Sequence, residues 1–155
     1  IIYTGVDGIF YPPLPLKSLK KLDIEDKVLF TGKVSNPLDY MSKSSAFVLS
    51  SGIEGMPNTL LEAMKCGLPS IATDTAAAEI IDPDNYEGKS YQGMECCKYG
   101  IVVKSKDTAS MAMAMKRMYE DKVLRDSYID AQKGYMKEFT MDKVISGWMD
   151  VICKS

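Results

Sequence analysis

Two glutamates in the middle of the chain have the residue type and spacing best suited to chemistry. Glu54 and Glu62 lie eight positions apart, and Gly55, Met56 and Pro57 follow the first of them. A carboxylate has two acceptor oxygens and can bind two neighbouring hydroxyl groups, as a ribose or another sugar presents them. Glycine lets the backbone approach a ligand closely. The pair is therefore able to hold two different sugars of one ligand.

The elements expected around the pair favour a phosphate nearby. The apolar run 46–50 predicts a strand, and residues 57–65 predict a helix that Gly67 ends. In an open parallel sheet, ligands bind where a strand ends and the next helix begins. The free N–H groups and partial positive charge of a helix N-terminus suit a phosphate or a polar sugar. Glu62 falls within this helix, roughly one to two turns from its start.

A purely structural interpretation of both glutamates stays open on spacing alone. A glutamate just before a helix complements the helix dipole, which is a sufficient reason for Glu54. Glu62 fits equally well as a solvated residue on a helix face.

The rest of the chain predicts an α/β fold, with a Rossmann-like parallel sheet covered by helices on both faces. The expected strands are continuous apolar runs, which are typical of parallel sheets buried on both sides. These runs cover residues 1–4, 27–32, 46–50, 70–73 and 100–103. Helical patterns begin near residues 14–16 and then cover 37–43, 57–65, 76–81, 107–120, 121–138 and 141–153. Residues 82–98 are polar and rich in turn formers, and they predict a long loop.

Composition limits the function classes. The 155 residues are 46% hydrophobic, enough for a single domain spanning 1–155. A formal net charge of -2 offers no electrostatic basis for a nucleic acid partner. With no histidine and no Cys-x-x-Cys pair among the four cysteines, no metal site is predicted, and the protein is expected to be reduced and cytoplasmic. Acid–base chemistry must then come from carboxylates, from the substrate or from a part of the protein outside this sequence.

The segment 51–74 resembles the signature of glycosyltransferase family 4, whose members are retaining enzymes with the two-domain GT-B fold. The resemblance extends over nearly the whole chain, since residues 28–32, 46–51 and 100–103 and the C-terminal helices also fit. It implies that the chain is the C-terminal, donor-binding half of a GT-B fold.

The resemblance also implies a role for each residue of the signature. Glu54, the catalytic-site residue, would bind hydroxyls of the transferred sugar without acting as a nucleophile. The remaining donor contacts would come from Gly55, Met56, Pro57, Asn58, Thr59 and Leu60 along the sugar and diphosphate, and from Glu62 at the ribose. Lys33 and Val34 would border the base, although an ordinary surface lysine is an equal interpretation of Lys33.

The implied activity is that of a hexosyltransferase. It would move a sugar from a UDP- or GDP-sugar to an acceptor hydroxyl in glycan, glycolipid or polysaccharide synthesis, without a metal or another cofactor. The implied partners are the nucleotide-diphosphate sugar and an N-terminal acceptor domain of the same protein. Any peripheral membrane association would involve parts outside this sequence.

Two departures from the family pattern keep alternatives open. The strand–helix unit that carries a diphosphate-clamping Arg and Lys is expected before Ile1, as is the acceptor domain, so this fragment alone should not transfer sugar. The segment from Thr75 to Glu79 lacks the glycines common in the family. The alternatives are a catalytically inactive nucleotide-sugar-binding or interaction domain, and another GT-B enzyme such as a nucleotide-sugar epimerase.

Overall fold

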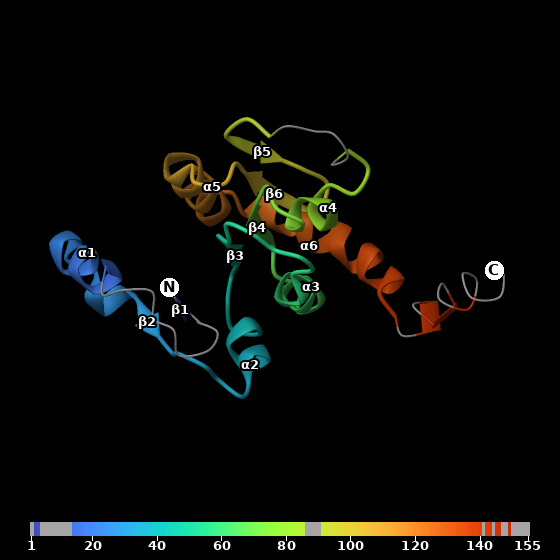
Figure 1. The fold of residues 1–155 in the computed structure, drawn as a ribbon, viewed down its shortest axis with the longest axis horizontal. Helices are drawn as coiled ribbons and strands as arrows, with labels where there is room; N and C mark the ends of the chain where they lie inside the picture. The colour runs from blue at the N-terminus through green and yellow to red at the C-terminus, as the bar shows by residue number, and fades with distance from the viewer. Residues whose placement is uncertain are drawn as a thin grey trace. The chain divides into compact units, whose positions relative to one another are not determined.

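The computed structural model describes residues 2–3, 14–85 and 91–140, together with residues 142, 143, 145, 146 and 149. The chain separates into two compact units, Ile1–Lys43 and Ser44–Ser155, whose elements are labelled in Figure 1. The prediction of a single domain over 1–155 stays a prediction. The helix predicted over 141–153 lies mostly outside the described residues.

The first unit contains two short parallel strands. β1 (Ile2–Tyr3) pairs with β2 (Leu29–Phe30). The helices are α1 (Leu14–Leu22), the 3₁₀ turn η1 (Glu25–Lys27) and α2 (Pro37–Met41). β2 is shorter than the predicted strand 27–32 because Lys27 belongs to η1. Gly32 follows β2 with a φ of 63°, a conformation that favours glycine.

The second unit is built on a sheet in the order β3-β4-β6-β5. The strands β3 (Phe47–Leu49), β4 (Ser70–Thr73) and β6 (Gly100–Val103) are parallel to one another. Every residue of β4 and of β6 is buried, and apart from Ser70 and Thr73 the two strands carry no polar side chain, as in parallel sheets covered on both faces. The predicted parallel sheet is therefore confirmed.

The fourth strand, β5 (Met94–Cys96), corrects the prediction that 82–98 is one long loop. It pairs antiparallel with β6, with Met94 opposite Val103 and Cys96 opposite Ile101. As an edge strand, β5 keeps some exposure at every residue and carries a glutamate. It therefore lacks the apolar run by which the other strands are predicted, and its pairing depends on the neighbouring β6.

Helices cover both faces of this sheet, as predicted. On one face, Ala72 and Val102 pack with residues of α3 (Asn58–Lys65) and α4 (Ala77–Ile81). On the other, Ile71 and Ile101 pack with residues of α5 (Thr108–Glu120) and of the N-terminal half of α6 (Lys122–Tyr135), whose C-terminal half packs with the first cluster. The 3₁₀ turn η2 (Met136–Glu138) continues α6, the long orange helix of Figure 1.

The end of α3 is determined by a glycine, as the sequence predicts. Gly67 has a φ of 75°. Its N–H donates to the Met64 carbonyl and the Leu68 N–H donates to the Ala63 carbonyl, each across 3.0 Å. This is the Schellman arrangement, which satisfies carbonyls at a helix C-terminus and turns the chain sharply. It returns the chain to the sheet as β4.

Candidate functional site

The candidate site lies at the edge where the three parallel strands end. Leu49, Thr73 and Val103 are the last residues of β3, β4 and β6. Because the strands are parallel, the loops that follow them emerge at the same edge of the sheet. The longest of these loops, 50–57, joins β3 to α3 and carries Glu54.

Most of the signature residues are accessible to solvent. Glu54 is half-buried, and its neighbours Ile53 and Met56 are 92% and 63% exposed. The others with exposed surface are Gly55, Asn58, Thr59 and Glu62. The loop and the start of α3 therefore present backbone and two carboxylates to solvent on the second unit.

The N-terminus of α3 has no side-chain cap. Pro57 occupies the cap position and has no side-chain acceptor, in contrast to Asp107 and Asp121 at the starts of α5 and α6. The Asn58 N–H donates to the Met56 carbonyl at 2.9 Å, which makes the turn into the helix tight. The Leu60 N–H donates to the Pro57 carbonyl at 3.0 Å, so that of the first three N–H groups of α3 the Thr59 N–H is the one available to an anionic oxygen from a ligand.

Pro57 and Leu60 anchor the start of α3. Pro57 is buried, and Leu60 has an exposed fraction of 0% and packs with Met64 in the core. In this structure Leu60 contributes packing, and its predicted contact with a donor stays a prediction. The burial of these two residues holds one end of the Glu54 loop.

Two polar side chains that sequence reasoning did not single out, those of Thr73 and Asp74, connect the loops at this edge. The Thr73 hydroxyl donates to the Ser51 carbonyl across 2.6 Å. The Ser105 N–H donates to Asp74 Oδ1 across 2.6 Å, and the Asp74 N–H donates to the Val103 carbonyl across 2.9 Å. Their place at the end of the predicted strand 70–73 was the only signal in the sequence that could have suggested them.

The segment without glycines, Thr75 to Glu79, satisfies its backbone internally. The Thr75 N–H donates to the Thr73 carbonyl at 2.8 Å, and the Ala78 N–H donates to the Thr75 carbonyl at 2.9 Å. The Thr75 hydroxyl accepts from the Ala77 N–H at 3.4 Å. These bonds form a turn that leads directly into α4.

Lys33 and Val34 belong to the first unit, just after Gly32. Lys33 is exposed and Val34 is partly buried. Their predicted place beside the base stays a prediction.

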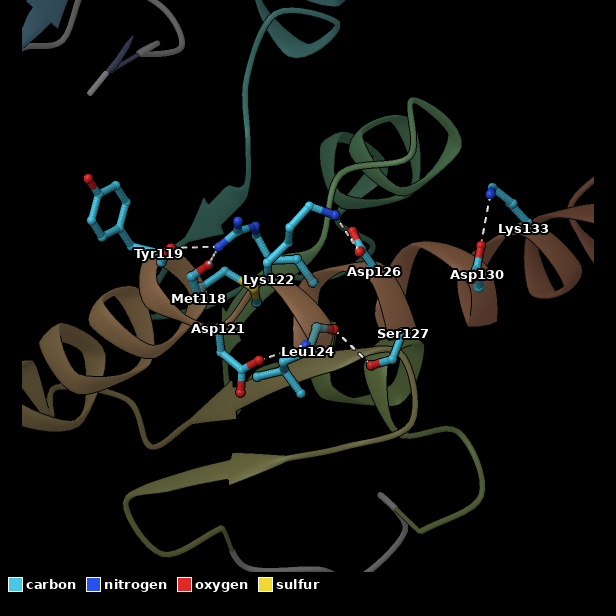
Figure 2. A network of polar contacts seen from close by, with 10 residues as sticks. Met118, Tyr119, Asp121, Lys122, Leu124, Asp126, Ser127, Asp130 and Lys133 are labelled. Carbon is cyan, nitrogen blue, oxygen red and sulfur yellow. Dashed lines mark hydrogen bonds and ion pairs between the residues drawn. The ribbon is translucent and has the colours of Figure 1, made fainter.

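A separate hollow of about 560 Å³ lies where α5 meets α6, lined by residues 113, 116, 117 and 120–123. Figure 2 shows polar contacts at this corner and along α6. Asp121 caps α6 by accepting from the Leu124 N–H at 2.9 Å. Arg125 donates to the carbonyls of Met118 and Tyr119 at 2.7 and 2.6 Å, which satisfies the end of α5. This hollow is a helix–helix corner and is not the candidate site.

Two features are absent from the part of the chain that the structure describes. No group of three or more His, Cys, Asp or Glu side chains there is arranged to hold a metal ion. No helix in the same part of the chain has the length and apolar character needed to cross a membrane.

The architecture defines the class of protein: a parallel sheet with helices on both faces, as in the GT-B glycosyltransferases. The Anabaena protein Alr3699/HepE, solved in complex with UDP, superposes with a TM-score of 0.80 at 17% identity, over 99% of this chain and 40% of that one. The group 1 glycosyl transferases match residues 5–121, and the chain belongs to this family. The prediction of a glycosyltransferase GT-B domain is thus confirmed.

Two relatives illustrate the family. An uncharacterized glycosyltransferase of Methanocaldococcus jannaschii is 32% identical over 84% of this chain and 36% of its own length. N-acetylgalactosamine-N,N'-diacetylbacillosaminyl-diphospho-undecaprenol 4-alpha-N-acetylgalactosaminyltransferase of Campylobacter jejuni is 31% identical over 83% of this chain and 32% of its own. The chain therefore spans about a third of the length of these relatives.

Proposed function

We propose that this chain is the donor-binding domain of a retaining hexosyltransferase that uses a UDP- or GDP-sugar. One observation carries the proposal. Glu54, on the loop after β3, and the exposed Glu62, on α3, lie on either side of a helix N-terminus that has no side-chain cap. That order of groups matches the sugar, diphosphate and ribose of a nucleotide sugar.

Each part of the proposed site has a separate role. Glu54 accepts hydroxyls of the transferred sugar and orients it. The backbone of Gly55, Met56, Pro57 and Asn58, with the start of α3, lies along the sugar and diphosphate. Glu62 accepts both ribose hydroxyls, because one carboxylate has enough acceptor sites for a diol.

The proposed reaction passes through an oxocarbenium-like transition state, as glycoside chemistry does generally. Negative charge then develops on the leaving diphosphate. Donors aimed at the developing charge lower the barrier, and the helix N-terminus supplies such donors here. The proposed transfer needs no metal ion and no other cofactor.

The relatives support a nucleotide-sugar donor without identifying the sugar. Alr3699/HepE has been solved with UDP-glucose as well as with UDP. The Campylobacter relative is a 4-alpha-N-acetylgalactosaminyltransferase whose name contains a diphospho-undecaprenol acceptor. For this chain we propose an acceptor hydroxyl in glycan, glycolipid or polysaccharide synthesis. An N-terminal acceptor domain of the same cytoplasmic protein would bind that acceptor.

Binding to the purified chain tests the proposal. We expect UDP- or GDP-sugars to protect residues 55–62 from amide hydrogen exchange, because a ligand oxygen would accept from the Thr59 N–H and the bound ligand would cover the loop and the start of α3. Glu62→Gln should weaken binding about tenfold or more, since it removes a charge-assisted pair of hydrogen bonds. Glu120→Gln, an exposed carboxylate on α5, is the matched control and should bind as the native chain does.

Two results would count against the proposal. One is the absence of protection at 55–62 with every UDP- and GDP-sugar tested. The other is protection that survives Glu62→Gln unchanged, because the ribose would then be held elsewhere. Sugar transfer is assayed with the acceptor domain present. If this chain then binds donor but no sugar is transferred, it is the catalytically inactive nucleotide-sugar-binding domain named above as an alternative.

A further inference from the structure

We infer that Thr73 is a positioning residue of the donor site, because its hydroxyl holds the loop that carries Glu54. The inference rests on the proposed function for its consequence in binding. Thr73 itself is buried and would not contact the donor.

The geometry identifies one hydrogen bond. Thr73 is the last residue of β4 and is 4% exposed. Its Oγ1 lies 2.6 Å from the Ser51 carbonyl oxygen and 3.5 Å from the Leu49 carbonyl oxygen. A hydroxyl has one proton to donate, and the shorter distance is that of a strong O–H···O bond. Ser51 is therefore the acceptor.

This bond begins where the backbone pairing of β3 ends. The β3–β4 ladder joins Phe47, Val48 and Leu49 to Ser70, Ile71 and Ala72. Thr73 lies one residue beyond that ladder, and its backbone is paired to Val103 on the opposite side. The Thr73 side chain thus extends the contact between β3 and β4 by two residues, to Ser51.

The loop between the two anchors has little packing of its own. Ser51 is held by Thr73 at one end, and Pro57 is buried at the other. Between them, Ile53 and Met56 are largely exposed. The path of the backbone through Glu54 and Gly55 therefore depends on its ends. A shift of about 1 Å in a positioned group is enough to lose much of its effect on a bound substrate.

Three substitutions separate the hydroxyl from the methyl group of Thr73. Thr73→Val keeps the shape and removes the hydroxyl. Thr73→Ser keeps the hydroxyl and removes the methyl group. Thr73→Ala removes both. Thr73→Ser and Thr73→Ala therefore differ by the hydroxyl alone, and they form a matched pair even if Thr73→Val folds poorly.

We expect the affinity for donor to depend on the hydroxyl group at position 73. In the purified chain, with UDP-glucose and GDP-mannose as probes, Thr73→Val and Thr73→Ala should raise the Kd roughly tenfold, whereas Thr73→Ser should stay within about twofold of the native value. Amide exchange over 51–57 should accelerate in Thr73→Val and Thr73→Ala but not in Thr73→Ser. The free energy of unfolding, measured in parallel, should instead fall in both Thr73→Ser and Thr73→Ala, because both lose the methyl group.

The outcomes are distinguishable. Equal rates of amide exchange over 51–57 in Thr73→Ser and Thr73→Ala overturn the inference, whether or not a donor binds. The inference is also overturned if, across the three variants, the Kd correlates with the free energy of unfolding and not with the presence of the hydroxyl. A third outcome is that the native chain binds neither probe while amide exchange over 51–57 is still faster in the variants without the hydroxyl. In that case the proposed donor site is wrong, and the conclusion that Thr73 holds the loop is kept.

Discussion

Gln132 and Tyr99 are joined by a buried hydrogen bond in which Gln132 Nε2 donates to the Tyr99 carbonyl oxygen across 2.7 Å. The bond links α6 to the residue just before β6. The Tyr99 ring also stacks on Tyr135, with ring centroids 4.1 Å apart. The two contacts hold the C-terminal half of α6 against the sheet.

Gln132→Leu should destabilise the second unit by about 1–3 kcal/mol, because it leaves the Tyr99 carbonyl without its donor. Gln132 Oε1 has no hydrogen-bond partner among the described residues, which places the loss toward the lower end of that range. Urea unfolding followed by circular dichroism measures the change. Lys133→Gln, at the exposed neighbouring position, should stay within about 0.5 kcal/mol of the native chain. An equal fall in the free energy of unfolding for Gln132→Leu and Lys133→Gln would contradict the role of the buried hydrogen bond.

Gly100→Ala should be strongly destabilising, by several kcal/mol. A Cβ at Gly100 would lie 2.4 Å from the Ser70 carbonyl oxygen, so that β4 and β6 would have to move apart. The matched control is Gly134→Ala on an exposed turn of α6, where a Cβ meets nothing within 4 Å. That change should stabilise the chain by about 0.5–1 kcal/mol through helix propensity. In thermal unfolding, the melting temperature should fall in Gly100→Ala and rise in Gly134→Ala.

Asp107→Ala should reduce stability at neutral pH and should do so less as the pH falls. Hydrogen bonds from the Ser110 N–H and hydroxyl, at 2.9 and 2.7 Å, hold the pKa of Asp107 below its ordinary value of 3.8. A lowered pKa in the folded state gives a stabilisation that is complete above 3.8 and is lost as the pH falls below it. Melting temperatures of the native chain and the variant, compared from neutral pH down to about pH 2, should converge at the acid end. A difference that stays constant with pH would exclude the charged cap as its cause.

Glu54→Gln and Glu62→Gln should have different effects on UDP and UDP-glucose. If Glu62 holds the ribose, its loss should weaken both ligands by a similar factor, about tenfold or more. If Glu54 holds the transferred sugar, its loss should weaken UDP-glucose and leave UDP unchanged. Calorimetric titration of each variant with each ligand gives four dissociation constants, and each is compared with the value for the native chain. Equal weakening of UDP by both variants would show that Glu54 does not act through the sugar.

Much of the second unit could be predicted from local signals. The buried strands β4 and β6 are short runs of mainly apolar residues, and Gly67 marks the end of α3 because the turn there requires a positive φ. The edge strand β5 could not be predicted, because its three residues are partly exposed and pair only with a neighbour already in the sheet. The 22-residue separation between Thr73 and Ser51 similarly leaves no pattern in the sequence.

The sequence by itself determined the family signature, the alternation of strands and helices, and the place of Glu54 and Glu62 around the start of α3. These features depend on residue type and on spacing along a single element, which are local. Only the tertiary structure decided the strand order, the burial of Leu60 and the polar contacts of Thr73 and Asp74 that connect the loops at the carboxyl edge. Those features depend on which distant segments pack together, because burial and hydrogen bonding are properties of the neighbours that folding supplies.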